Sequence, residues 1–272
     1  MPVEGKHQEA TAPTGFNPLR DVMLVIVFFT RLPMPFVSFS SGSLATAAWA
    51  FPFAGVLTGG VAGAVFYGTF LVGAPLLIAI ILGFVASVVL SGGLHEDGLA
   101  DVADGFGGGV TREKKLEIMH DSRIGTYGVL ALVLSVGLRV AALLAIAQQA
   151  GPSTAAAVFF AVGICTRGFL PFVMRALPHA RSDGLSKGAG RPGIAGTGMA
   201  VILGGLGAMV PFHADVFPVV VALFAAGCGV IVVCIIAKRQ IGGQTGDVIG
   251  AAQQLGEVTA LIVLSVLLGG SL

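Results

Sequence analysis

Acidic residues are concentrated in one stretch of this 272-residue chain. Seven of its 14 aspartates and glutamates lie between positions 95 and 121. If residues 95–104 form a helix, Asp97, Asp101 and Asp104 are spaced i, i+4 and i+7, so their carboxylates share one face. Like charges at this spacing repel each other, and Mg²⁺, which prefers carboxylate and phosphate oxygens, would neutralise them. We therefore expect these aspartates, with the adjacent Glu96, to bind Mg²⁺, although a solvated acidic loop remains the alternative.

Glycines and cations follow the acidic stretch. The run Gly105–Gly109 (GFGGG) would let the backbone approach a bulky anion, or serve as a hinge between helices. The segment DSRIGTYG then places Asp121, Ser122 and Arg123 just before an apolar stretch. We expect Arg123 to contact a phosphate, whereas Lys114 and Lys115 are better explained as markers of the cytoplasmic side.

A second polar island is GGQTGD at 242–247. Asp247, preceded by Gln244 and Thr245, is suited to binding a metal or a hydroxyl group. It is equally suited to capping the helix that follows, as is Thr245. The basic loop 175–192, which contains Arg181, could cover a phosphate.

Composition excludes a water-soluble globule. Hydrophobic residues make up 55% of the chain and charged residues only 11%, against about 25% charged residues in an ordinary soluble domain. The mean hydropathy is +0.94. The net charge of +1 gives no reason to expect nucleic acid as a partner, and the three cysteines show neither disulfide nor zinc spacing. The expected partner is the lipid bilayer.

Seven segments approach the roughly 20 apolar residues that a membrane-spanning helix needs. They are residues 44–70, 74–94, 126–149, 152–174, 193–212, 215–237 and the short 257–272. With these spans, 13 of the 15 lysines and arginines fall on one side, which the positive-inside rule assigns to the cytoplasm. The other two, Arg139 and Arg167, lie inside spans and are candidate site residues for that reason. We predict an all-α, polytopic membrane bundle with the N-terminus inside and the C-terminus outside.

The segment 19–36 has an apolar core too short to cross a bilayer, so we expect it to be interfacial or re-entrant. Residues 1–18 are polar and lack the pattern of a signal peptide, and we expect a disordered cytosolic leader. Residues 19–272 would then form a single membrane-embedded domain. In the first span, Gly55, Gly59 and Gly63 recur every four residues, which would let another helix approach closely.

With these residues assembled, the chain closely resembles the cobalamin synthase family, the adenosylcobinamide-GDP ribazoletransferases. The resemblance covers most of the chain. Its motifs are TRLPMP at 30–35, GGLHEDGLADVADGF, KKLEIMHDSRIGTYG, ARSDGL and GGQTGDVIGAAQQLGE at 242–257.

The resemblance implies a bacterial cytoplasmic-membrane transferase that acts late in vitamin B12 synthesis, with its active site facing the cytoplasm. It would join adenosylcobinamide-GDP to α-ribazole, or its 5′-phosphate, release GMP and require Mg²⁺. The expected catalytic residues are Asp97, Asp101, Asp104 and Asp247. The expected substrate-binding residues are Arg31, His95, Gly105, Asp121, Ser122, Arg123, Arg167, Arg181, Gln244 and Thr245. Homo-oligomerisation is left open.

Two other activities share the acidic chemistry. A CDP-alcohol phosphotransferase also holds metal with aspartates on a membrane helix, but the arginine expected after DGxxA is Asp101 here. A divalent-cation transporter would place its carboxylates in the middle of the membrane, whereas these lie at a boundary.

Overall fold

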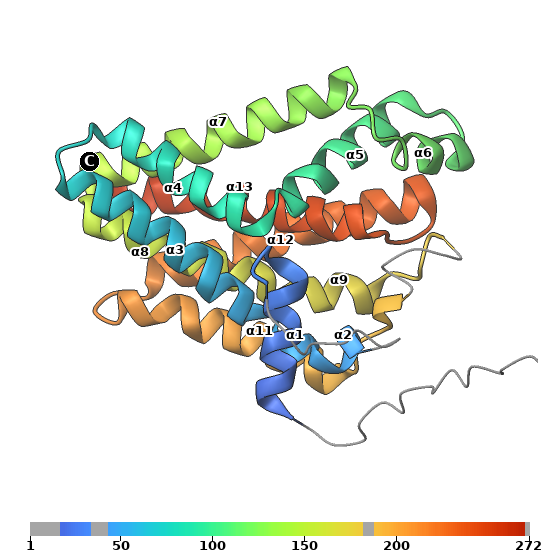
Figure 1. Ribbon diagram of the computed structural model, residues 1–272, viewed down its shortest axis with the longest axis horizontal. Coiled ribbons are helices and arrows are strands. Elements are labelled where there is room, and N and C mark those ends of the chain that lie inside the picture. The colour runs from blue at the N-terminus through green and yellow to red at the C-terminus, as the bar shows by residue number, and fades with distance from the viewer. Residues whose placement is uncertain (1–16, 34–42, 182–187, 270–272) are drawn as a thin grey trace, which may run out of the picture.

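The computed structural model describes residues 17–33, 43–181 and 188–269, and within these ranges the chain forms helices and no strand. Figure 1 shows the arrangement. The helices are α1 (Pro18–Phe29), α2 (Ser43–Thr46), η1 (Ala47–Ala50), α3 (Phe51–Leu71), α4 (Leu76–Ser91), α5 (Leu94–Gly108), α6 (Arg112–Ile118), α7 (Thr126–Gln149), α8 (Pro152–Gly168), α9 (Leu170–Ala176), α11 (Ile194–Met209), η2 (Val210–Phe212), α12 (Phe217–Ile241) and α13 (Gly246–Gly269). This confirms the predicted all-α class.

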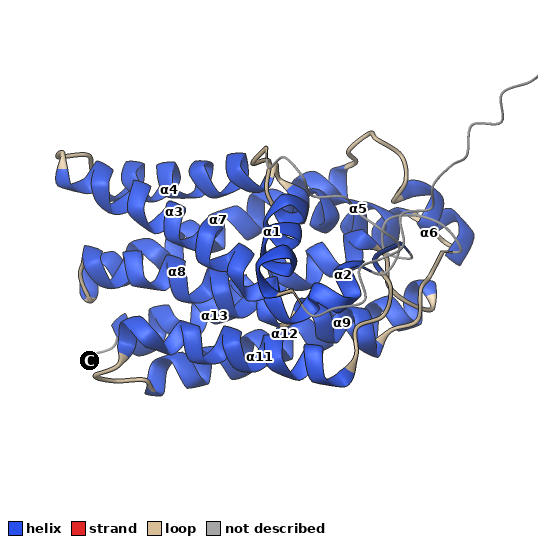
Figure 2. Ribbon diagram, turned by 60° about the horizontal axis from the view of Figure 1, so that its bottom comes forward, coloured by secondary structure: helices blue, strands red, loops and turns tan. Residues whose placement is uncertain are grey.

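The long helices match the predicted spans. Six are long and apolar enough to cross a membrane, and α4 with α5 adds a seventh if that bent pair counts as one span. The connections α3–α4 and α11–α12 and the end of α13 lie at one end of the bundle, whereas α5, α6 and α9 lie at the other (Figures 1 and 2). The basic connecting segments therefore gather at a single end, as the charge distribution predicts.

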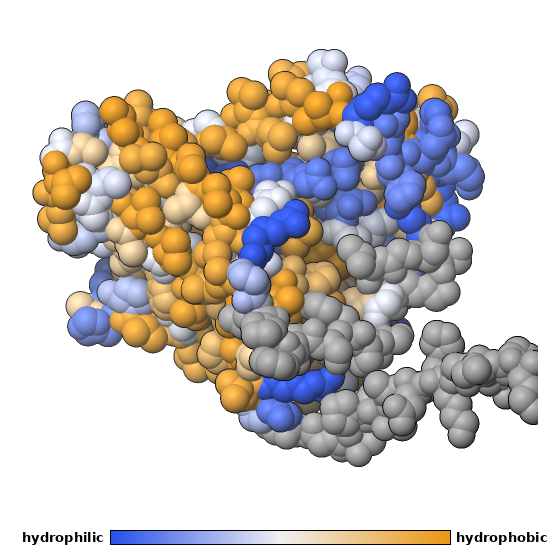
Figure 3. All heavy atoms as spheres, in the orientation of Figure 1, coloured by the Kyte–Doolittle hydropathy of each residue, from blue (hydrophilic) through white to orange (hydrophobic). Residues whose placement is uncertain are grey.

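The outer faces of these helices are apolar. Leucine, isoleucine, valine and phenylalanine side chains are exposed along α4, α7 and α12. Figure 3 shows apolar residues covering much of the molecule, and hydrophilic residues gathering over α5 and α6. An exposed apolar surface of this extent is typical of contact with lipid.

The last span differs from the prediction. It begins at Gly246, not at residue 257, and continues to Gly269. The average hydropathy of residues 246–256 is low because the helix carries Asp247, Gln253 and Gln254. In the structure both glutamines are buried between helices, so these polar side chains do not meet lipid.

The N-terminal helix α1 has 12 residues, about 18 Å of helix, which is shorter than the roughly 30 Å hydrocarbon core. Its buried side chains Leu24, Val25 and Phe29 join a core with η1 and the start of α3. It runs across the direction of the long helices (Figure 1), so the expectation that 19–36 does not span is confirmed for its described part. Of the predicted leader 1–18, only Asn17 and Pro18 are described, and they begin α1.

A sharp bend turns the polar helix α5 out of the line of α4. The two axes differ by 87°, and the turn is made by Gly92 (φ 67°) and Gly93 (φ 69°). Left-handed backbone of this kind favours glycine. The side chain of Arg31 packs directly on Gly92, and its backbone N–H donates to the Leu90 carbonyl (2.7 Å).

The glycine repeat of the first span packs against α8, as predicted. A Cβ atom at Gly59 would lie 2.6 Å from the Phe159 carbonyl oxygen, and one at Gly63 would lie 2.7 Å from that of Ala156. Gly55 meets Gly163 in the same interface. The two backbones therefore touch, a contact that any side chain would prevent.

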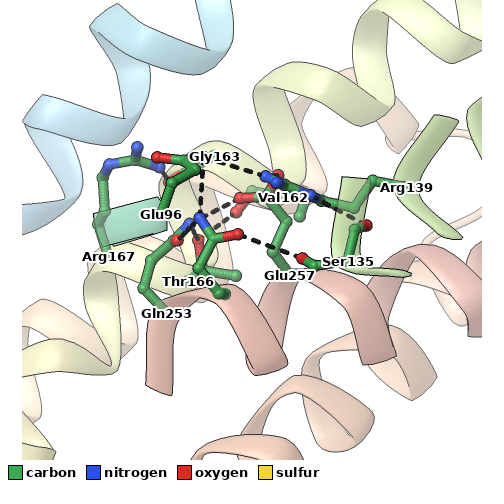
Figure 4. A network of polar contacts seen from close by, with 10 residues as sticks. Glu96, Ser135, Arg139, Val162, Gly163, Thr166, Arg167, Gln253 and Glu257 are labelled. Carbon is green, nitrogen blue, oxygen red and sulfur yellow. Dashed lines mark hydrogen bonds and ion pairs between the residues drawn. The ribbon is translucent and has the colours of Figure 1, made fainter. Parts of the chain in front are cut away.

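A buried polar network ties α5 to the bundle. The Arg139 guanidinium on α7 pairs with Glu96 of α5 and Glu257 of α13, each at 3.3 Å. Gln253 donates to Glu257 (2.6 Å), and Gln254 donates to Glu96 (3.1 Å). Figure 4 shows these side chains converging from several helices. The Arg139 side chain is only 3% exposed, so the glutamates supply the charge compensation that burial demands.

Neutral groups complete this network. The Thr166 hydroxyl of α8 accepts from Gln253 (3.2 Å), and the Ser135 hydroxyl of α7 donates to Gln254 (3.4 Å). Arg167, also on α8, donates to the Gly163 carbonyl (3.0 Å). Helices α5, α7, α8 and α13 are thus connected through polar contacts inside the bundle.

Gly59→Ala should destabilise the protein. Overpacking of a tight interface costs roughly 1–3 kcal/mol, which outweighs the better helix propensity of alanine. The matched control is Gly60→Ala, because a Cβ there meets only the Phe160 side chain, at 3.9 Å. Thermal unfolding of the detergent-solubilised protein should give a lower midpoint for Gly59→Ala than for Gly60→Ala. The reverse order would contradict the backbone contact.

Arg139→Met should also lower the unfolding midpoint, because it leaves two partly buried carboxylates without their buried cation, at a cost of up to roughly 3–5 kcal/mol. Arg123→Met is the comparison, since Arg123 forms a shorter ion pair with Asp121 (2.6 Å) but is 87% exposed. Exposed pairs contribute little to stability. Equal midpoints for the two variants would show that the buried network does not hold the helices together.

Candidate active site

Two aspartates of α5 and one of α13 form the centre of the candidate site, which we call the aspartate cluster: Asp97, Asp101 and Asp247. Helix α5 spans the predicted 95–104 and extends to Gly108. A Cβ at Gly98 would lie 2.8 Å from the Asp247 carbonyl oxygen, and one at Gly250 would lie 3.2 Å from the His95 Cα. These two glycines let the first turns of α13 lie against α5, and so bring Asp247 to the predicted acidic face.

Repulsion and partial burial act on this cluster. The carboxyl of Asp101, on the polar helix outside the apolar spans, is half-buried. Burial, followed by the charges of Asp247, Asp97 and Asp104, raises its pKa to about 7, and Arg181 opposes that rise. A bound cation would stabilise the ionised form of Asp101, because its neighbours disfavour that form.

Asp104 has a different role in the structure. Its Oδ2 accepts from the Gly125 N–H (2.6 Å) and its Oδ1 from the Gly128 N–H (2.9 Å), at the start of α7. Both carboxylate oxygens are thus engaged by the N-terminus of a helix, where a negative charge is favourable. Asp104 lies on the predicted face, but it is buried and joins α5 to α7.

Glu96 is also placed apart from the aspartate cluster. It was expected among the metal ligands, but its carboxylate pairs with Arg139 and accepts from Gln254. The predicted set Glu96, Asp97, Asp101 and Asp104 is therefore not brought together as one group. In the described part of the chain, no three His, Cys, Asp or Glu side chains form a ready-made metal cage.

The donor set nevertheless suits Mg²⁺. This ion keeps several waters and is commonly held by one or two carboxylates together with substrate phosphates. Asp97 is exposed, while Asp101 and Asp247 are partly exposed, so oxygen donors from α5 and α13 are open to a metal–phosphate complex. Of the four predicted metal ligands, Asp97 and Asp101 are the two that lie together and are open to solvent, and Asp247 lies beside them.

The island 242–247 is attached to the loop before Arg181. Gln244 donates its backbone N–H to the Pro178 carbonyl (2.8 Å), and the Gln244 carbonyl accepts from Ala180 N–H (2.9 Å). The Gln244 side-chain amide lies 3.0 Å from the His179 ring nitrogen. Gln244 is 1% exposed, so it fixes the loop rather than facing solvent.

Of the two predicted capping residues, Thr245 caps α13. Its hydroxyl accepts from the Val248 N–H (3.3 Å) and donates to Asp247 Oδ2 (3.1 Å). Thr245 therefore orients the Asp247 carboxylate. This leaves Asp247 as the member of the island that reaches the aspartate cluster.

Basic residues surround this end of the molecule but are largely engaged. Arg181 donates to the Leu116 carbonyl (2.5 Å) and lies 3.4 Å from the His120 ring nitrogen. Arg112 donates to the carbonyls of Ile241 and Ala180 and so caps the end of α12. Arg181 interacts electrostatically with the carboxyl groups of both Asp101 and Asp247. It is therefore the arginine that the structure brings to the cluster.

The motif 121–123 forms an exposed turn. Arg123 donates to Asp121, and this hydrogen bond lowers the pKa of the Asp121 carboxyl to about 2. Ser122 is exposed next to them. Because Asp104 binds the N–H of Gly125, this turn is anchored two residues beyond Arg123.

Gly105 does not form an anion-binding loop. Residues 105–108 continue α5, and a Cβ at Gly105 would lie 2.9 Å from the Lys115 carbonyl oxygen. Its role is therefore to let α6 pack closely on α5. The expectation of an open glycine loop or hinge at 105–108 was wrong because the helix continues through it.

Two arginines predicted to bind substrate lie away from the cluster. Arg31 is exposed at the α4–α5 bend. Arg167 is 4% exposed inside the bundle, where it lies beside Glu257 around a void of about 20 Å³. The structure does not bring either arginine to the aspartate cluster.

Sequence reasoning missed Gln253, Gln254 and Glu257. Gln253 and Gln254 occur in a segment taken to lie outside the membrane, and Glu257 is the first residue of the predicted last span, so their place inside the bundle was not anticipated. Their spacing could have revealed them. Gln253 and Glu257 are one helical turn apart, so they place polar side chains on one side of an otherwise apolar helix.

Comparisons with known proteins indicate the family of the chain. The family model described as cobalamin-5-phosphate synthase matches residues 21–265. A protein of Mesorhizobium japonicum named adenosylcobinamide-GDP ribazoletransferase is 43% identical, over 92% of this chain and 94% of that protein. Proteins of the same name from Rhizobium etli and Bradyrhizobium diazoefficiens are 39% and 42% identical, over 90% and 91% of this chain and 96% and 94% of theirs.

No solved structure matches the chain. The family model covers the aspartate cluster, the turn 121–123 and the island 242–247 in one continuous match. From this coverage and the identity shared with the three relatives, the chain belongs to the cobalamin-5-phosphate synthase family.

Proposed function

We propose that this protein is a Mg²⁺-dependent adenosylcobinamide-GDP ribazoletransferase of the bacterial cytoplasmic membrane. The observation that carries the proposal is the aspartate cluster, in which α5 and α13 bring three carboxylates to the basic end of a membrane bundle. The named relatives carry out, by their name, a transfer to a ribazole from adenosylcobinamide-GDP.

The reaction exchanges the anhydride bond of a diphosphate for an ester bond at the same phosphorus. A ribose hydroxyl of α-ribazole, or of its 5′-phosphate, attacks the phosphorus next to the corrinoid. A new P–O bond forms, the P–O bond to GMP breaks, and GMP leaves with the electron pair. The hydroxyl proton must pass to a base, and Asp247 is the best placed because it lies at the edge of the cluster and Thr245 orients it.

The transition state of phosphoryl transfer spreads negative charge over its oxygens, so positioned cations are the main source of catalysis. Asp97 and Asp101 would hold Mg²⁺, which supplies charge neutralisation at the diphosphate. Arg181 adds a fixed positive charge next to Asp101 and Asp247. Arg123, exposed on its anchored turn, remains our candidate for contact with the departing GMP.

The two other activities are less well supported. Membership of the cobalamin-5-phosphate synthase family argues against a CDP-alcohol phosphotransferase. A cation transporter needs free carboxylates across the membrane, whereas the partly buried Glu96 and Glu257 are paired with Arg139.

The active site should face the cytoplasm, because the basic segments lie at its end of the bundle. The test places one cysteine in a cysteine-free background, either Glu113→Cys on α6 or Asp215→Cys in the α11–α12 connection. In spheroplasts, a membrane-impermeant maleimide should label position 215 at once and position 113 only after lysis. Labelling of position 113 in intact spheroplasts would reverse the orientation.

Asp101→Asn should reduce GMP release from adenosylcobinamide-GDP and α-ribazole by at least a hundredfold, because it removes a metal ligand without changing the side chain's size. The control is Asp215→Asn, the same substitution at the opposite, exposed end of the bundle. Both variants should unfold near the wild-type temperature. Wild-type turnover by Asp101→Asn would refute the assignment.

Removal of divalent metal should abolish wild-type GMP release, and added Mg²⁺ should restore it. Ca²⁺ should restore it poorly, because its larger and more variable coordination suits this small donor set less well. Full activity after exhaustive chelation would rule out the metal requirement. It would not contradict the transferase assignment, because the same assay would have detected GMP release.

A further inference from the structure

A cavity of about 200 Å³ opens beside the aspartate cluster. Its wall is mainly apolar and aromatic, formed by Phe28 and Phe29 of α1, Leu44 of α2, Phe51 of α3 and Met174 of α9. On the side of α5 and α13 the lining is polar and consists of His95, Asp97 and Asp247. A pocket with aromatic walls and a few polar groups on one side is typical of sites for small planar ligands.

One polar group of this cavity lacks a protein partner. His95 is 3% exposed, and its Nε2 is one of two buried side-chain polar atoms in the described chain without a hydrogen-bond partner. Leaving such a group unpaired is costly. The imidazole lies beside the Phe29 ring, with 5.7 Å between their centroids, and both side chains line the cavity.

We propose that this cavity binds the planar heterocyclic base of the nucleoside substrate, with His95 Nε2 hydrogen-bonded to the free ring nitrogen of that base. This inference rests on the proposed function and names the subsite for one of its substrates. The base of a ribazole is a benzimidazole: flat, largely apolar, and with one ring nitrogen left to accept a hydrogen bond. The phenylalanine side chains would pack on its rings, and His95 would satisfy its single acceptor.

The other substrate also carries a planar base, guanine. Guanine presents several donors and acceptors on its edges, and each would need a partner after burial. Beyond His95, the described polar lining is confined to Asp97 and Asp247, and the remaining wall is apolar. The chemistry of the cavity therefore favours the ribazole base over guanine.

The position of the cavity fits the reaction. Asp97 and Asp247 belong both to its lining and to the aspartate cluster. A base held among the phenylalanines would leave its ribose next to these carboxylates, where a hydroxyl can lose its proton. The cavity thus aligns the nucleoside with the phosphorus that it attacks.

The test measures binding and turnover with two nucleosides, α-ribazole and the analogue in which CH replaces the free ring nitrogen. Equilibrium dialysis with purified full-length protein in nanodiscs gives the Kd, and GMP release gives the KM. Wild-type protein should bind α-ribazole roughly 3- to 10-fold more tightly than the analogue, the range expected for one hydrogen bond. His95→Phe should bind both equally, and its KM for adenosylcobinamide-GDP should be unchanged.

His213→Phe is the matched control, because His213 is exposed in the α11–α12 connection at the far end of the bundle. It should keep the wild-type preference for α-ribazole. The wild-type comparison of the two nucleosides needs no substitution, so it tests the proposal even if His95→Phe fails to fold.

Three results would overturn the subsite. In the first, wild-type protein binds α-ribazole and the analogue equally. In the second, His95→Phe retains the preference for α-ribazole over the analogue. In the third, His95→Phe loses affinity for GMP and adenosylcobinamide-GDP instead, which would assign the cavity to guanine. Failure of the proposed function would give a different result. Wild-type protein would then release no GMP, while equilibrium dialysis would still measure nucleoside binding to the cavity.

Discussion

A polar helix packed against an apolar bundle needs a partner for each of its charges, and α5 meets this requirement differently on each side. Glu96 pairs with Arg139 inside the bundle. Asp104 accepts from the N-terminal N–H groups of α7. Among the described residues, Asp97 and Asp101, with Asp247 from α13, have no such dedicated cation, and the charges of Asp247 and Asp97 raise the pKa of Asp101. Glu96 and Asp104 therefore hold α5 in place, whereas the carboxylates of Asp97, Asp101 and Asp247 remain available to bind a ligand.

This division explains how far the sequence alone could predict the site. Spacing correctly predicted that residues 95–104 form a helix with three aspartates on one face, because helical periodicity is a local property. Spacing could not show that the N-terminus of α7 would engage Asp104, since that contact joins residues 21 and 24 positions apart. It also could not separate Glu96 from its neighbour Asp97, because the distinction depends on where Arg139 lies.

The fold shows the same limit. Hydropathy located five of the six long spans with small errors at their ends, since an apolar helix in lipid is recognised by composition. It failed for α13, where Gln253, Gln254 and Glu257 lower the average but point to partners on α5, α7 and α8. The family motif at 242–257 included these residues without indicating their role. Their role depends on tertiary contacts, which composition does not encode.

The balance of charge differs between the interior of the bundle and its rim. Inside the bundle, Arg139 and Arg167 face Glu96 and Glu257, two positive charges against two negative ones. These four interior charges therefore offset one another, as an apolar environment favours. At the rim, Asp97, Asp101 and Asp247 are opposed within the described residues mainly by Arg181, which leaves an excess of negative charge. A bound diphosphate would add to this excess, and the proposed Mg²⁺ would offset it at the rim rather than inside the bundle.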